Sequence, residues 1–244
     1  MDWTGKGMVI MKIISFVFVK YILILCYLYL NPNSSIGYWR LTLGGLEVET
    51  SMNILYVAIM TLPDFLFYHY ISSKYIRQLK ENYVYIFVRE KNMANWWRKF
   101  FGLGVKHLII YEVAAVLILL ISGIGLQKNI EISISQFIEI ILCQLLRLVI
   151  IMTICNILLL KFNEMIAVFT NLVIQVVPFF VVGVLYDIDG AWKKAIIYIP
   201  FNWYHYNYLI ELNSNFFVIL GMLVVFEIML YLYSEVLFKN HEAI

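Results

Sequence analysis

The chain has 244 residues, 63% of them hydrophobic and 14% charged, with a mean hydropathy of +0.83. A soluble domain has roughly half apolar and a quarter charged residues, so this composition excludes an ordinary soluble domain and predicts a membrane protein. The formal net charge of +2 is too small to indicate nucleic-acid binding. Cys26, Cys143 and Cys155 lie inside apolar segments without disulfide-framework or CxxC spacing, and we expect them to be small buried side chains.

Six segments are long and apolar enough to cross a bilayer, for which a helix needs about 20 residues. They span 8–30, 52–72, 103–126, 135–160, 165–186 and 215–238. The first could instead be a signal peptide, because a short apolar run follows Lys20. The region before Lys20 is itself apolar, and bulky residues occupy the place where a cleavage site needs small ones, so we expect a retained helix. The sequence thus predicts an all-α membrane protein with a single six-span domain.

The orientation follows from the loop between the second and third spans. This loop carries seven of the eighteen basic residues of the chain, namely Lys74, Arg77, Lys80, Arg89, Lys91, Arg98 and Lys99. Lysine and arginine accumulate in cytoplasmic loops, so the loop is predicted to be cytoplasmic. Threading the six spans outward from it places both termini in the cytoplasm as well.

Residues 83–101 of this loop are predicted to form an amphipathic helix. Aromatic and apolar residues fall on one side of a helical wheel, with Glu90 among them, and basic and amide residues fall on the other. Such a helix could lie on the inner leaflet as an interfacial anchor. It could equally be a docking helix for a cytosolic protein, and both uses are compatible because the helix has two faces.

Ionisable and amide residues inside the predicted spans need an explanation, since a charge at mid-bilayer costs about 2.5–3.5 kcal/mol on insertion scales. In the fourth span, Gln136, Glu139, Cys143 and Arg147 share one helix face, and Glu112 of the third span could reach Arg147. Such residues could lock neighbouring helices in register, or they could line a translocation path. The intramembrane candidates are Asp64, Glu112, Glu139, Arg147, Asn171, Gln175 and Glu227.

No pattern in the chain indicates catalysis. The four histidines form no HxxxH pair, and the sequence has no GxSxG motif and no GxxxxGK[ST] phosphate loop. We therefore expect neither an enzyme nor a metal site. The aromatic-rich loop 190–213 is expected on the outer side, where it could form a lid over a pathway or an interfacial belt.

The order of these elements resembles the six-span permease subunit of ABC-2 type transporters. The resemblance is greatest to small bacterial permeases of antimicrobial-peptide and lantibiotic export or immunity systems. It rests on "YIFVREKNMANWWRKF" (85–100), on the "KFNE" turn (161–164) and on the loop 190–213, and topologically it covers nearly the whole chain. One departure from the family is the start "MDWTGKG", which is too short for the amphipathic connecting helix that many members carry before their first span.

The resemblance implies a function. The chain would be the membrane subunit of an exporter in a bacterial cytoplasmic membrane, moving an amphipathic or modified peptide or another hydrophobic compound. ATP and Mg²⁺ would be bound by a separate ATPase chain, and a second copy or paralogue would complete a dimer. The helix 83–101 would be the coupling helix and the 161–164 turn a second contact, so the implied ATPase contacts are Arg89, Glu90, Lys91, Asn92, Asn95, Asn163 and Glu164. The alternative is a membrane scaffold or sensor subunit that recruits a cytosolic protein without transport.

Overall fold

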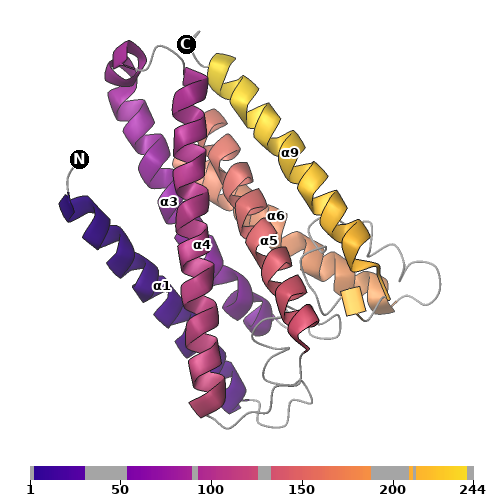
Figure 1. The fold of residues 1–244 in the computed structure, drawn as a ribbon. Coiled ribbons are helices and arrows are strands. Elements are labelled where there is room, and N and C mark those ends of the chain that lie inside the picture. The colour runs from indigo at the N-terminus through magenta and orange to yellow at the C-terminus, as the bar shows by residue number, and fades with distance from the viewer. Residues whose placement is uncertain are drawn as a thin grey trace.

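The computed structural model describes residues 3–30, 54–89, 93–125, 133–187, 209–210 and 213–240. Every regular element that spans several turns within these ranges is an α-helix, and Figure 1 shows these helices packed as one bundle. They are α1 (Trp3–Leu30), α3 (Ile54–Arg89), α4 (Met93–Gly125), α5 (Ile134–Lys161), α6 (Glu164–Asp187) and α9 (Phe216–Asn240).

Four of the described helices are long and apolar enough to cross a membrane. These stretches are Ala94–Ile124, Ile134–Lys161, Glu164–Leu185 and Phe216–Phe238. The chain is therefore an all-helical protein with the character of a multi-pass membrane protein. Helix α1 contains the predicted span 8–30, and α3 contains the predicted span 52–72 from Ile54 onward; that these two segments cross the membrane stays a prediction.

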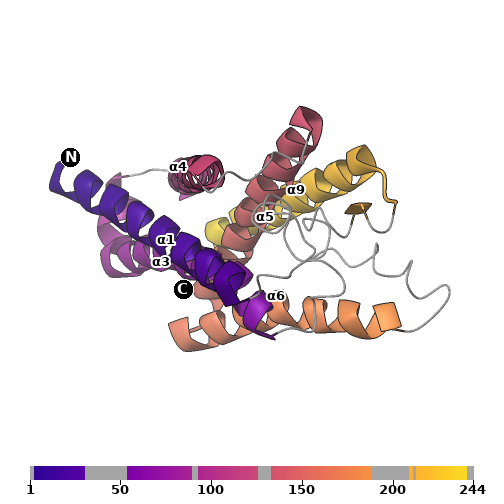
Figure 2. The same ribbon diagram turned by 90° about the horizontal axis from the view of Figure 1, so that it is seen from below.

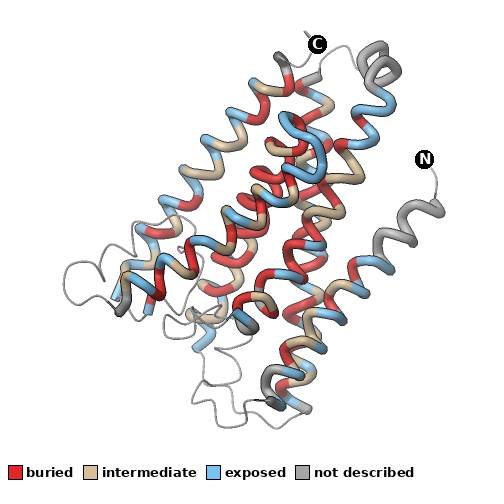
Figure 3. Tube along the Cα trace, turned by 180° about the vertical axis from the view of Figure 1, so that it is seen from behind, coloured by how far each residue is buried: buried red, intermediate tan, exposed pale blue. Residues whose placement is uncertain are grey.

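Helix α5 is the centre of the bundle. It contacts α3, α4, α6 and α9, and 61% of its most apolar stretch is buried, compared with 11% for α9. The cause is visible in its sequence, since the run 148–160 is apolar on nearly every side of the helix. Figure 3 accordingly shows the buried residues concentrated in the middle of the bundle, while the outer helices alternate between buried and exposed positions.

The apolar interior is divided into two clusters. One contains Ile24 of α1 and Phe179 of α6, and the other contains Val17 of α1 and Trp97 of α4. Helix α1 contributes to both clusters, with Lys20 between Val17 and Ile24 along the chain. Asp64 likewise lies along the chain between Ile59 of the first cluster and Phe65 of the second.

Helix α3 is longer than its predicted span and changes direction near its end. It continues past residue 72 to Arg89, but Asn82 has φ −115° and ψ 21°, which are not helical values. In Figure 1 the last turns of α3 are seen end-on, because they turn away from the rest of the helix. Figure 2 shows the same bundle from below, with α4 seen nearly end-on and α1 running along α3, which it contacts.

Within the described residues, the predicted helix 83–101 is divided between two helices. Its first part, 83–89, forms the last turns of α3, and its second part begins α4 at Met93. Residues 90–92 between them lie outside the described residues. The physical reason is that side chains of the second part, such as Trp97, pack into the bundle and extend α4.

The loop 190–213, expected as an outer lid or belt, also lies almost wholly outside the described residues. Cys143 and Cys155 are buried as expected, whereas Cys26 is exposed.

Candidate functional site

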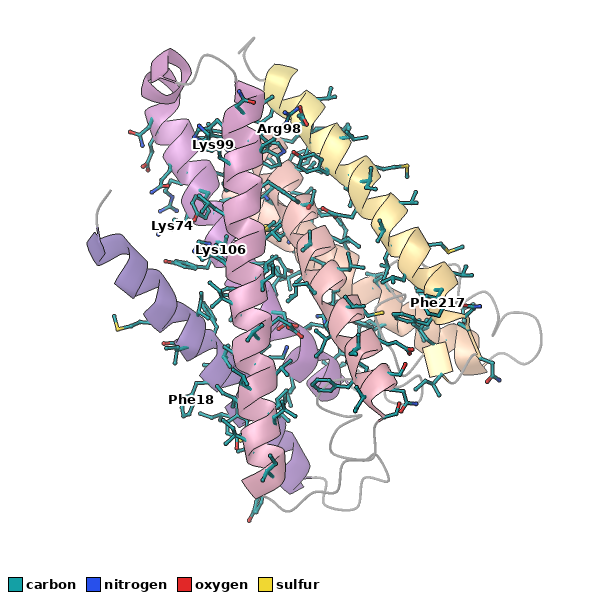
Figure 4. The ribbon with its side chains drawn as sticks, in the orientation of Figure 1. Phe18, Lys74, Arg98, Lys99, Lys106 and Phe217 are labelled. Carbon is teal, nitrogen blue, oxygen red and sulfur yellow. The ribbon has the colours of Figure 1, made fainter. Side chains whose placement is uncertain are left out.

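One end of the bundle, which we call the basic end, carries many of the described cations. Figure 4 places Lys74, Arg98, Lys99 and Lys106 in the half that holds the start of α4, and Phe18 and Phe217 in the other half. The turn between α5 and α6 at 162–163 also lies at this end, since α5 ends at Lys161 and Lys80 of α3 contacts its last residues.

Two contacts connect α3 to the α5–α6 turn at the basic end. The Arg77 guanidinium donates from Nη2 to Oε2 of Glu164 at 3.1 Å. The Lys80 ammonium donates to the backbone carbonyl oxygen of Leu159 at 2.9 Å, which satisfies one of the free carbonyls of the last turn of α5. The segment that leads to 83–89 and the turn 161–164 are thus physically joined.

Asn163 and Glu164, both predicted ATPase contacts, have clear structural roles in this turn. The side-chain oxygen of Asn163 accepts a hydrogen bond from the backbone N–H of Ile166 at 2.9 Å, so Asn163 caps the start of α6. Glu164 Oε1 lies 3.8 Å from Nε2 of His69, in addition to its contact with Arg77. Both side chains remain exposed.

A second connection joins the start of α4 to the end of α9. Trp97 is fully buried, and its ring stacks on Phe238 with 4.5 Å between centroids and contacts Phe100 at 5.1 Å. Beside it, Arg98 Nη2 donates to Oε1 of Glu235 at 2.9 Å. Trp97 therefore anchors α4 in the bundle.

The remaining predicted coupling residues are less fully described. Asn95 is exposed on the first turns of α4. Arg89 is the last residue of α3, and Glu90, Lys91 and Asn92 lie outside the described residues.

A buried ionic cluster surrounds Asp64, which is 1% exposed. Lys20 Nζ and the hydroxyl of Tyr111 each donate to its Oδ1 at 2.8 Å. Arg147 Nη2 lies 3.3 Å from its Oδ2. These four side chains come from α1, α3, α4 and α5, so one carboxylate connects four helices.

The ion pair that the structure shows for Arg147 is with Asp64, rather than with Glu112 as the sequence suggested. Glu112 is also buried and lies close enough to interact electrostatically with Lys20, Asp64 and Arg147. The cluster therefore contains two cations and two carboxyl groups, and this balance offsets the cost of removing the charges from water.

The amide residues of α6 form a seam beside this cluster. Asn171 and Gln175 are buried, and the Gln175 side-chain amide donates to the Tyr68 hydroxyl and, at 3.3 Å, to the backbone oxygen of Asn171. Asn156 of α5 is also completely buried, and neither polar atom of its side chain has a hydrogen-bond partner among the described residues.

The predicted polar face of α5 has two different parts. At its start, Gln136 and Ser133 form a capping box, and Glu139 accepts a hydrogen bond from Ser135 at 3.2 Å. Further along, Cys143 and Arg147 are buried in the bundle. Only this second part belongs to the interior polar groups.

Glu227 of α9 is held by α5. One of its carboxylate oxygens accepts a hydrogen bond at 2.8 Å from the hydroxyl of Thr153, which is fully buried. It does not belong to the Asp64 cluster, since Thr153 lies nearly two turns beyond Arg147 on α5.

Sequence reasoning missed Lys20, Tyr111 and Asn156 as members of the polar interior. A signal existed for Lys20. A lysine in one predicted span and an aspartate in the next indicate an ion pair between the two helices. Asn156 stands alone in a long apolar run, which is also a usable signal. Tyr111 has no such signal, because tyrosine is common throughout the chain.

No known protein family, curated protein or solved structure matches the chain. Within the described residues, no group of three His, Cys, Asp or Glu side chains could hold a metal ion.

Proposed function

We propose that the chain is the membrane-spanning subunit of an ATP-driven exporter of the ABC-2 type, with ATP hydrolysed by a separate cytosolic ATPase. The segment 83–89, the start of α4 and the turn 161–164 form the surface that the ATPase contacts. The proposed substrate is an amphipathic or modified peptide or another hydrophobic compound. The functional unit is a dimer with a second copy or a paralogue. The membrane is the bacterial cytoplasmic membrane, with the basic end inside.

The observation that carries this proposal is the link between the two contact sites. A transporter of this kind needs both sites to move together when the ATPase subunits close. The Arg77–Glu164 ion pair and the Lys80 hydrogen bond to Leu159 join the turn 161–164 to the part of α3 that leads into 83–89. A membrane protein that only displayed one docking helix would have no need for this connection.

Helix α3 would transmit a movement of the basic end to the other helices of the bundle. Helix α3 carries Arg77 near the basic end and Asp64 in the ionic cluster, so a displacement of its end is transmitted to a point where four helices meet. Packed helices move as stiff bodies between discrete arrangements, which allows a push at one end to change the packing at the other. In this account the Asp64 cluster holds the helices in register.

The alternative is a scaffold or sensor subunit that uses the same basic end to recruit a cytosolic protein. Both functions predict a protein at this surface, and they differ in whether that protein hydrolyses ATP.

Photo-crosslinking in native cells distinguishes the two. A photoreactive amino acid is placed at Asn95 or at Met165, which are exposed at the start of α4 and in the turn region, and, as a control, at the exposed Leu232 of α9. We expect the first two positions to crosslink the same ABC ATPase and Leu232 to give no such product. Crosslinks only to a cytosolic protein without ATPase activity would support the scaffold, and crosslinks only to lipid would contradict both.

A further inference from the structure

A pocket of about 610 Å³ opens between α1, α3 and the start of α6. One continuous face of α3 forms most of its wall, with a residue from each neighbouring helix at its sides. The lining includes Phe16 of α1, Leu66, Ser73, Lys74 and Glu81 of α3, and Glu164 of α6.

The lining changes in character along α3. Leu66 and Phe16 form its apolar end, inside the predicted spans. Ser73 and Lys74 are the first residues after the predicted span 52–72, about 12 Å further along the helix axis than Leu66. Glu81 lies about two turns beyond Lys74. From the bilayer outward the pocket thus presents apolar, then basic, then acidic groups.

Lys74 is the cation that the pocket offers to a ligand. The ion pairs shown among the described lining residues join Arg77 and His69 to Glu164, and none of them includes Lys74. A further cation stands at the rim, since Nζ of Lys12 lies 4.2 Å from the centroid of the Tyr70 ring.

We propose that this pocket binds one phospholipid from the inner leaflet, with phosphatidylethanolamine as the preferred species. Its phosphate contacts the ammonium of Lys74 and the hydroxyl of Ser73, and its acyl chains lie against Leu66 and Phe16. Its own ammonium group donates hydrogen bonds to the carboxylate of Glu81. Pockets with basic residues between helices on the cytoplasmic side bind phosphate-bearing headgroups, and the carboxylates in this lining favour a zwitterionic headgroup over an anionic one.

The site would exist whether or not the chain transports anything, because it requires only that α1 and α3 lie in a membrane. Its place beside the Arg77–Glu164 pair means that a bound headgroup would contact the link between the two proposed ATPase contacts.

The test is native mass spectrometry of the full-length protein, delipidated in detergent and titrated with phosphatidylethanolamine or phosphatidylcholine of the same acyl chains. Phosphatidylcholine keeps the phosphate but carries no N–H donor. We expect wild type to bind phosphatidylethanolamine about tenfold more tightly. Glu81→Gln should remove this preference, and Lys74→Glu should weaken binding of both lipids by about tenfold or more.

Lys106→Glu is the matched control, because Lys106 is an exposed cation on α4 outside the pocket, and it should leave both affinities unchanged. Lys74→Gln replaces Lys74→Glu if the reversal lowers the thermal midpoint. Equal affinity of wild type for the two lipids, or equal binding by the Lys74 variants and wild type, would overturn the proposal. So would a protein dimer that Lys74→Glu dissociates without any change in lipid binding, since a second copy would then be the occupant.

Discussion

Asp64 is the residue on which most of the buried charge contacts converge. Replacing it by Asn removes the negative charge that pairs with Lys20 and Arg147, and both cations then remain in the interior without that carboxylate. Breaking a buried ion pair by removing one partner costs about 3–5 kcal/mol. We expect Asp64→Asn to lower the thermal unfolding midpoint of the detergent-solubilised protein strongly.

The control for this prediction is Glu139→Gln. Glu139 is a carboxylate of α5 near the end of the helix and only partly buried, so its loss should cost less than about 1 kcal/mol. Midpoints that fall equally in the two variants would show that the Asp64 cluster contributes nothing particular to the stability of the bundle.

The sequence predicted which polar residues are buried better than it predicted which residues they pair with. Asp64, Glu112, Arg147, Asn171 and Gln175 were all predicted inside spans, and all are buried. Glu112 was expected within reach of Arg147, and it interacts with Arg147 electrostatically, but the ion pair of Arg147 with Asp64 was not predicted. Spacing along one helix defines a face but does not give the position of residues on the neighbouring helix. The relative position of residues on two neighbouring helices depends on how the helices pack, which no local sequence pattern specifies.

The helices themselves were the most predictable elements. The bounds of α5 and α6 differ from the predicted spans by one residue at each end, since long apolar runs with polar ends are a strong signal. The ends of α3 and α4 at the basic end were less predictable. Amphipathicity indicated a helix over 83–101, but could not show that Trp97 would be drawn into the bundle as part of α4.

The change of direction at Asn82 should depend on that residue. The side-chain amide of Asn82 donates to the backbone oxygen of Gln78 at 3.1 Å, and Ala favours the helix over Asn by about half a kcal/mol. We expect Asn82→Ala to straighten α3, which would place spin labels at 66 and 88 roughly 33 Å apart along the axis. Pulsed electron paramagnetic resonance should show a shorter distance in wild type.

Gln78→Ala provides the comparison for this measurement, because Gln78 is exposed on the same helix and only its backbone oxygen takes part in the contact. A distance that is identical in wild type and in Asn82→Ala would contradict the assignment of the turn to Asn82.

The contact of α4 with α5 depends on Gly104. A Cβ atom there would meet Sδ of Met152 at 2.8 Å, whereas a Cβ at Gly102 would meet nothing within 4 Å. The contacted atoms are the flexible end of the methionine and can move, so the branched valine is expected to cost about 1 kcal/mol, at the low end of the range for overpacking. We therefore expect Gly104→Val to lower the thermal midpoint and Gly102→Val to leave it nearly unchanged, and equal effects would contradict the close approach.

The whole molecule is a bundle with a central α5, an exposed apolar surface and one basic end. Large apolar side chains are exposed along α9 and α6, which is the expected exterior of a protein surrounded by lipid. The amino-acid composition alone predicted a membrane protein, but composition cannot show which helix is central.

The orientation of the molecule is testable with single cysteines. In a background with Cys26 replaced by Ser, a membrane-impermeant maleimide applied to intact cells should label a cysteine at Asn213. It should label one at Asn95 only after the cells are permeabilised, since the basic end is expected inside. Labelling of Asn95 in intact cells would reverse the orientation.

The central claim is that the basic end binds an ATPase, and co-purification from native cells tests it most directly. The wild-type protein, the charge-reversed Arg89→Glu/Lys91→Glu variant and the control Lys106→Glu are purified in mild detergent, and bound proteins are identified and assayed for ATP hydrolysis. We expect an ABC ATPase with the wild type and with the control, and its loss from the charge-reversed variant. If no ATPase accompanies the wild-type protein, the exporter proposal is wrong.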